Sequence, residues 1–208
     1  MRYSLSLCVA AFCLATAAAA AGDTAPATKP DKATYIPKEE VDQVSKAEPD
    51  GDRNIRVVDI GHENFAVGIV HRGKTVNGKM AARASMKLPP PKPCGQKADK
   101  LPDGGYPAGI IHDVQTEGYY IVSGGGTMYT DGYIVNGGLY DLKELNGPTC
   151  IGTAYNVTVR TVKEGDIVII PAGVVHGWLD IPDHVDYLSF RPSPGILEAG
   201  WVNPAIAK

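Results

Sequence analysis

The sequence has little excess of charge of one sign and few aromatic residues other than Tyr. Its 208 residues carry 20 Lys and Arg against 23 Asp and Glu, a formal net charge of −3, with two Trp and three Phe. A nucleic-acid-binding surface presents a basic stripe, or Lys and Arg interleaved with aromatics. The lysines here are scattered through turns and the N-terminal segment. We therefore expect no nucleic-acid partner.

Long amphipathic helical patterns and internal repeats of solenoid length are also missing. Gly and Pro are plentiful instead, at 24 and 16 residues. They separate short β-branched or aromatic runs such as NIRVVDIG, GYYIVSGGGTMYT and VDYLSFRPS. Many short strands at close spacing predict an all-β domain, a barrel or a double-sheet jelly roll, over residues 51–193.

A long apolar run occurs only at the N-terminal end, in MRYSLSLCVAAFCLATAAAAAG. It follows the early Arg2, and small residues precede Gly22 in an Ala-x-Ala setting, which is typical of a secretory signal peptide over residues 1–21. The run is too short and too rich in alanine to span a membrane comfortably. We expect an exported protein, secreted or periplasmic, with no membrane association after cleavage.

The segments that flank the predicted barrel contain few large apolar residues. Residues 22–50 are rich in Ala, Thr, Lys, Asp, Glu and Pro, so we expect a flexible, disordered linker with one short helix around EEVDQVSKA. Residues 194–208 are expected to form a C-terminal tail. One domain thus follows the signal peptide and linker.

Cysteine is scarce. The chain has four, and removal of the signal peptide leaves Cys94 and Cys150. In an oxidising compartment a single disulfide between them is the economical interpretation, and two unpaired thiols are the alternative. A cysteine-based metal site is not expected, because neither residue has a neighbouring cysteine at ligand spacing.

The stretch IIHDVQTEGYYIVSGGG places a carboxylate at the start of a predicted strand. Glu117, Tyr119 and Ile121 alternate and therefore share one face. An ionised carboxylate on the inward face of a barrel costs several kcal/mol if it has no partner. Three kinds of partner are possible for Glu117: a Lys or Arg, a hydrogen-bonded cluster, or a metal held jointly with histidines.

Two stretches resemble the motifs of the cupin superfamily. The segment GDIVIIPAGVVHGWLD resembles the second cupin motif: Gly165 is followed after five residues by Pro171-x-Gly173, and His176 comes after two more. Residues 112–124 resemble the first motif, in which a His-x-His pair is followed by Glu and then Gly. Glu117 and Gly124 have that spacing. The resemblance implies a cupin-type jelly-roll β-barrel.

The first motif departs from the family pattern at Ile110, where its first histidine should stand. In similar metal-binding cupins, the positions of His112, Glu117 and His176 hold a divalent metal. The resemblance thus implies a three-ligand site, with Fe(II) favoured and Mn(II), Ni(II) or Zn(II) as alternatives. Some cupins with incomplete ligand sets bind no metal, so a metal-free barrel is the competing interpretation.

The resemblance implies three classes of function. We rank oxygenase-type chemistry, as in a dioxygenase, first, because two histidines and one carboxylate leave room for O₂ and a small organic substrate. A metal-dependent lyase or isomerase acting on a carbonyl or sugar-derived acid is second. A non-catalytic, ligand- or sugar-binding cupin is third. Many cupins dimerise, so a homodimer is a candidate assembly.

Other residues are weaker candidates. Tyr119 is the one candidate catalytic residue, although a core role is favoured. His71 is considered as a substitute for the missing ligand and Asp180 as an acceptor for His176. Gln115 is expected to be exposed in a turn, and Arg83 could bind an anion if it faces inward. Residues 127–164 are expected to add a hairpin, either a surface insertion or a lid.

Overall fold

The computed structural model describes residues 30–47, 51–75, 92–143, 145–193 and 195–207. The predicted signal peptide and Arg83 lie outside the described residues. The described part contains one helix and eleven strands. Their bounds are α1 (Lys38–Ala47), β1 (Gly51–Asp59), β2 (Asn64–Gly73), β3 (Lys92–Cys94), β4 (Tyr106–His112), β5 (Glu117–Thr130), β6 (Tyr133–Leu142), β7 (Gly147–Tyr155), β8 (Thr158–Lys163), β9 (Ile167–Ile170), β10 (His176–Asp180) and β11 (His184–Ser193).

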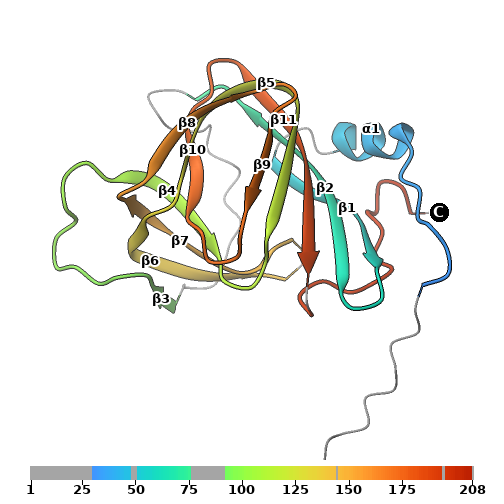
Figure 1. The fold of residues 1–208 in the computed structure, drawn as a ribbon, viewed down its shortest axis with the longest axis horizontal. Helices are drawn as coiled ribbons and strands as arrows, with labels where there is room; N and C mark the ends of the chain where they lie inside the picture. The colour runs from blue at the N-terminus through green and yellow to red at the C-terminus, as the bar shows by residue number, and fades with distance from the viewer. Residues whose placement is uncertain (1–29, 48–50, 76–91, 144, 194, 208) are drawn as a thin grey trace, which may run out of the picture.

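The strands form an antiparallel barrel in which β5 belongs to both walls. The strand order is β1-β2-β11-β5-β10-β4-β7-β6-β3, and β8 and β9 also pair with β5. The first part of β5 pairs with β9 and β11, and its last part pairs with β8 and β10. Figure 1 shows these strands curving around a common interior. The predicted all-β barrel is confirmed by these strand pairings.

A glycine lets β5 pass from one wall to the other. Gly124 has a φ of 68°, a left-handed conformation that glycine adopts at little cost. An added Cβ at this position would lie 2.1 Å from the backbone oxygen of His184. The glycine of the first motif therefore serves the sharp bend of the strand and the close approach of β11.

The interior of the barrel changes from apolar to polar along its strands. In β11, buried residues alternate with partly exposed ones, so Val185, Tyr187, Ser189, Arg191 and Ser193 all face inward. The Val185 end packs into an apolar cluster with Ile121, Met128 and Ile181. The other end brings Arg191 beside Glu117. The fold thus concentrates polar side chains at one end of a closed interior.

The predicted flexible linker includes an ordered, packed helix. In its described part, α1 buries Val44 against Ile55 and Ile69. Glu40 accepts two hydrogen bonds from Arg56, at 2.7 and 2.6 Å. Residues 30–47 therefore include a segment of the folded domain, because Val41 and Val44 form an apolar stripe that the sheet covers.

The predicted C-terminal tail also packs against the barrel. Leu197 is buried with Val57 and Ala66, and Trp201 packs on the same cluster. The backbone nitrogen of Asn203 donates to the oxygen of Ile55 at 2.9 Å. The chain then runs beside α1 (Figure 1). The described part of this C-terminal segment therefore packs along β1 instead of forming a free tail.

The long segment between the motifs forms the β6–β7 hairpin, as predicted. Cys94 in β3 and Cys150 in β7 form a disulfide that joins strands on either side of β6.

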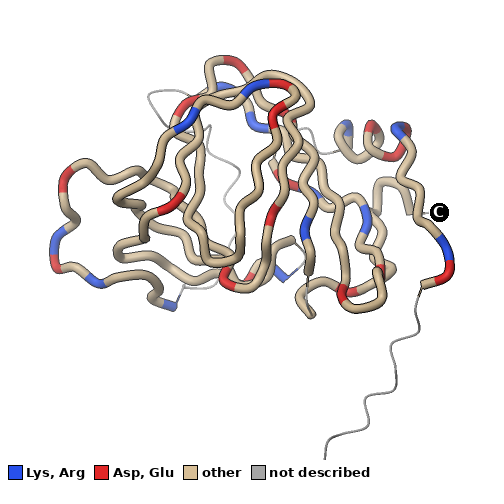
Figure 2. Tube along the Cα trace, in the orientation of Figure 1, with Lys and Arg blue, Asp and Glu red and all other residues tan. Residues whose placement is uncertain are grey.

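Figure 2 shows Lys and Arg interspersed with Asp and Glu along the described chain. No helix in the described residues is long and apolar enough to cross a membrane.

Candidate metal centre

Three neighbouring strands bring His112, Glu117 and His176 together. His112 ends β4, Glu117 begins β5 and His176 begins β10, which lies between those two strands. Their exposed fractions are only 3%, 1% and 2%. One potential ligand atom from each lies within 4.8 Å of the others. Within the described ranges this is the one group of three or more His, Cys, Asp or Glu side chains so arranged.

The two imidazoles converge on one carboxylate oxygen. His176 Nε2 lies 3.1 Å from Glu117 Oε2, and His112 Nε2 lies 3.7 Å from the same oxygen. The ring centroids of the two histidines are 5.4 Å apart. The three side chains therefore surround a common point in the polar end of the barrel.

Neighbouring groups set the tautomer of His112. Its Nδ1 lies 2.9 Å from Thr149 Oγ1, and Thr149 donates its own hydroxyl proton to the oxygen of Gly147, at 3.1 Å. Because a hydroxyl has a single proton, Thr149 must accept from His112 Nδ1–H. The neutral ring then carries its lone pair on Nε2, which faces the centre.

A backbone oxygen sets the tautomer of His176 in the same way. Its Nδ1 lies 3.1 Å from the oxygen of Val174, which can only accept, so Nδ1 carries a proton and the lone pair of the neutral ring is on Nε2. That Nε2 is buried without a hydrogen-bond partner. Two imidazole lone pairs and a carboxylate oxygen thus face one another, an arrangement that a proton or a metal cation would stabilise.

Burial keeps His112 neutral. Burial lowers its pKa from 6.5 to about 4, and the charges of His176 and Arg191 act in the same direction, against the opposing effect of Glu117. Metal ions bind the neutral, deprotonated form of imidazole. His112 is therefore in its ligand-competent form at neutral pH.

Glu117 is held by donors on both oxygens. Oε1 accepts from Arg191 Nε at 2.6 Å and from Asn146 Nδ2 at 2.8 Å. Oε2 accepts from the Tyr119 hydroxyl at 2.5 Å. Burial by itself would raise the pKa of Glu117, but the Arg191 guanidinium and the two histidines hold it well below its usual value. Glu117 is therefore ionised and fixed in orientation.

Arg191 connects the centre to β1. Its guanidinium is fully buried and also donates to the carboxylate of Asp52 and to Asn54 Oδ1. Of the three partners open to Glu117 from the sequence, the structure provides an arginine and a hydrogen-bonded cluster. The imidazole lone pairs that face Glu117 leave the third kind of partner, a metal ion, open.

The sequence did not identify Arg191, Asn146 or Thr149 as parts of the centre. For Arg191 a signal exists, because the alternation in VDYLSFRPS places it on the same face as Val185 and Tyr187. Asn146 and Thr149 come from the β6–β7 hairpin, whose NGPT sequence indicates a turn and nothing more. Their place in the centre follows only from how the hairpin packs.

Several weaker candidates lie elsewhere. His71 bonds Asp186 at 2.6 Å and stacks on His184, away from the centre, so it does not replace the missing ligand. Asp180 accepts from Thr75 Oγ1 at 2.9 Å, and not from His176. The expectation that Gln115 is exposed was wrong, because its side chain turns inward and donates to Ser193 Oγ.

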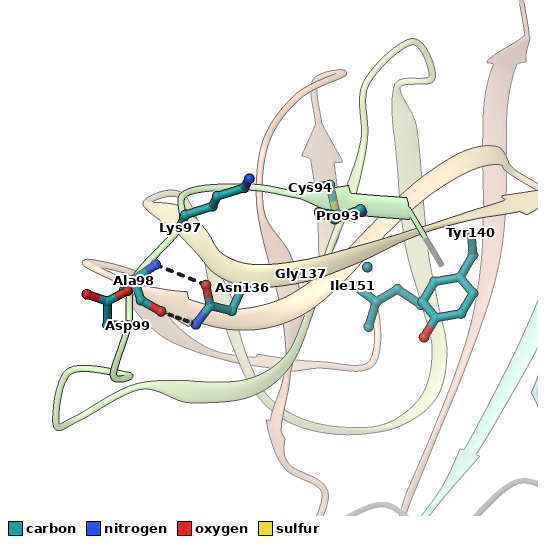
Figure 3. A pocket seen from close by; sticks show the side chains of 10 residues that line it. Pro93, Cys94, Lys97, Ala98, Asp99, Asn136, Gly137, Tyr140 and Ile151 are labelled. Carbon is teal, nitrogen blue, oxygen red and sulfur yellow. Dashed lines mark hydrogen bonds between the residues drawn. The ribbon is translucent and has the colours of Figure 1, made fainter. Parts of the chain in front are cut away.

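A surface hollow of about 810 Å³ lies beside the disulfide and is separate from the centre. Figure 3 shows Lys97 and Asp99 at its edge and Asn136 bonded to the backbone of Ala98. None of its lining residues is His112, Glu117 or His176. The hollow therefore offers no access to the candidate metal centre.

No protein-family model matches the chain, and no curated protein matches it. Three solved structures that it resembles can be compared. A protein with a double-stranded beta-helix domain from Klebsiella pneumoniae subsp. pneumoniae MGH 78578 is 18% identical, with a TM-score of 0.34, over 69% of this chain and 75% of that one. The Clostridium difficile EutQ protein is 8% identical, with a TM-score of 0.34, over 78% and 77%.

An oxalate oxidase in complex with glycolate is 15% identical, with a TM-score of 0.31, over 72% of this chain and 55% of the oxidase. These three are distant likenesses in overall shape. The description of the fold as an antiparallel barrel rests on the strand order.

Proposed function

We propose that this chain is a metal-dependent cupin enzyme in which His112, Glu117 and His176 hold one divalent ion, and that its chemistry is of the oxygenase type on a small organic substrate. One observation carries the proposal: His176 Nε2 is buried without a hydrogen-bond partner, and its lone pair faces Glu117 Oε2. A buried polar atom without a partner is costly, and a bound cation would remove that cost.

The donor set fits a first-row divalent metal. Two imidazoles and one carboxylate suit Fe(II), the ion we favour, as well as Mn(II), Ni(II) or Zn(II). When bound, Fe(II) in such a site supplies O₂ activation, because three protein ligands leave coordination positions for O₂ and substrate.

The protein's own contribution is to fix the ligands and keep the centre dry. Thr149 and the backbone oxygen of Val174 orient the two imidazoles, and Arg191 orients Glu117. Groups of this kind strengthen metal binding and set the direction of each ligand. With exposed fractions of 1–3% at the three ligands, bulk water is kept from the reacting groups.

Tyr119 acts as a donor in this scheme. Burial and the charge of Glu117 raise the pKa of its hydroxyl well above the usual value, so the hydroxyl keeps its proton and donates a hydrogen bond to Glu117 Oε2. We assign Tyr119 the role of orienting the carboxylate rather than that of a general base. We also infer export to an oxidising compartment, which the Cys94–Cys150 disulfide supports.

One observation favours a second candidate, a metal-free barrel that binds a small ligand. Arg191 already gives Glu117 a buried cationic partner at 2.6 Å, so the charge of the carboxylate does not by itself require a metal. In that case the centre would be a polar recognition site inside the barrel.

Nitric oxide, which replaces O₂ at open positions of Fe(II), tests the proposed chemistry without knowledge of the substrate. Purified protein is loaded with Fe(II) without oxygen and exposed to nitric oxide, and the electron paramagnetic resonance spectrum is recorded. We expect the signal of an iron–nitrosyl complex, lost in His176→Ala and kept in the control His184→Ala. Bound iron that gives no such signal would reject the oxygenase proposal and favour a lyase or isomerase.

A further inference from the structure

The amide of Asn146 lies where the centre lacks its fourth protein ligand. We propose that Asn146 Oδ1 is that ligand, in place of the imidazole that Ile110 cannot supply. The inference rests on the proposed metal centre. It assigns a metal-binding role to the turn between β6 and β7, far in sequence from both motifs.

Asn146 already contacts two of the three proposed ligands. It is 3% exposed, and its Nδ2 lies 2.8 Å from Glu117 Oε1 and 3.2 Å from His112 Nε2. Both are acceptor atoms, since the same Glu117 oxygen also accepts from Arg191 Nε and the proton of His112 lies on Nδ1, beside Thr149. The amide nitrogen therefore donates toward His112 Nε2, whose lone pair would bind a cation, and toward the carboxylate oxygen of Glu117 that also accepts from Arg191.

The other end of the amide has no partner. Asn146 Oδ1 is buried without a hydrogen bond, although an amide oxygen is a good acceptor. An amide nitrogen has no lone pair for a metal, whereas amide oxygens are regular ligands of cations. A half-turn about the Cβ–Cγ bond exchanges the two ends. With a cation in the centre, the proton-bearing end would be repelled and the oxygen attracted, so the ion itself favours the ligating orientation.

The backbone holds Asn146 in reach of the ion. Its nitrogen donates to the oxygen of Leu142 at 3.0 Å, and the next residue, Gly147, has a φ of 66°. An added Cβ on Gly147 would lie 2.5 Å from Ile196 Cγ2, so the turn is closely packed. Thr149, which orients His112, follows on β7. One hairpin therefore supplies both a ligand and the group that sets the tautomer of another.

Ile110 explains why a substitute is needed. It lies two residues before His112 in β4, so alternation places both on one face, and it pairs in register with His176. Its aliphatic side chain cannot ligate a metal. The centre thus replaces a ligand from β4 with one from a separate element.

The test is metal affinity rather than activity. Co(II) and Mn(II) dissociation constants are measured by competition with a chelator for the wild type, Asn146→Ala and Asn146→Asp. We expect affinity about 10- to 100-fold weaker in Asn146→Ala. Asn146→Asp, which replaces the amide oxygen with a charged one, should bind at least about 10-fold more tightly than Asn146→Ala. The visible spectrum of bound Co(II) should change in Asn146→Ala, because one ligand is lost.

Asn156→Asp is the matched control, since Asn156 is exposed in a turn and the substitution adds the same charge; it should leave affinity unchanged. Wild-type affinity and an unchanged Co(II) spectrum in both Asn146 variants would overturn this inference and leave the three-ligand centre standing. A wild-type protein that binds neither ion would overturn the metal centre and, with it, the role of Asn146.

Discussion

Two clusters in this barrel contain the same kinds of side chain, two histidines and one carboxylate, yet they differ in nearly every physical respect. At the centre, His112, Glu117 and His176 are 1–3% exposed. In the outer cluster, which we define as His71, Asp186 and His184, the side chains are 29–36% exposed.

The use of the carboxylate also differs. Asp186 bonds His71 through one oxygen, at 2.6 Å, and accepts from Ser123 through the other, at 2.7 Å. At the centre an imidazole nitrogen faces the carboxylate without a hydrogen bond. The comparison teaches that residue type does not define a metal site. Burial and convergent lone pairs distinguish the centre from a polar cluster on the surface.

The largest expected effect is at the centre and concerns Arg191. Arg191→Met leaves the buried carboxylate of Glu117 without its guanidinium partner, so we expect the free energy of unfolding to fall by about 3–5 kcal/mol. Urea unfolding in the presence of a chelator measures the loss. Lys163→Met breaks an ion pair whose lysine is 80% exposed and should change stability by less than about 1 kcal/mol. Equal effects of the two substitutions would contradict a buried, charge-dependent centre.

The second difference appears with pH. The pKa of His112 falls from 6.5 in the unfolded chain to about 4 in the folded one, so the unfolded state takes up its proton first on acidification. Stability from His112 is therefore full above pH 6.5 and is lost as the pH falls toward 4. At about 1.4 kcal/mol per unit, the loss is about 3–4 kcal/mol.

Urea midpoints across this pH range, measured without metal, compare the wild type with His112→Gln and His184→Gln. His112→Gln should flatten the pH dependence, whereas His184→Gln, in the outer cluster, should keep it. If the urea midpoint of His112→Gln fell with pH as steeply as that of the wild type, the proton uptake would belong to other groups.

The smallest effect is expected in the outer cluster itself. Asp186→Asn removes the charge from a partly exposed carboxylate, so the free energy of unfolding should fall by about 1 kcal/mol or less. Metal binding should not change, since Asp186 lies outside the centre. A large loss of bound metal in this variant would mean that the outer cluster, and not the centre, holds the ion.

Much of the fold was predictable because its signals are local. Strands of period two, separated by Gly, Pro, Asn and Asp, predict an all-β barrel, and the spacing of Gly165, Pro171, Gly173 and His176 predicts the turn between β9 and β10. The convergence of His112, Glu117 and His176 follows from that barrel. The alternation that places Glu117 and Tyr119 on one face is visible in the structure as their hydrogen bond.

The remainder of the centre depends on contacts between distant parts of the chain. Asn146 lies 29 residues from Glu117, and Arg191 lies 74 residues from it, so no local pattern connects them. The helix α1 lies where the sequence predicts one, but its packing against the sheet was not predicted, for a similar reason. Its apolar stripe is short, and only the sheet surface around Ile55 and Ile69 makes burial of Val44 favourable.

The most direct test of the central claim is elemental analysis of protein purified without chelators or a polyhistidine tag, for the wild type, His112→Ala, His176→Ala and the control His184→Ala. The account predicts about one equivalent of iron, manganese, nickel or zinc in the wild type and in His184→Ala, and none in the other two variants. A wild type that holds no metal after incubation with all four ions would contradict it.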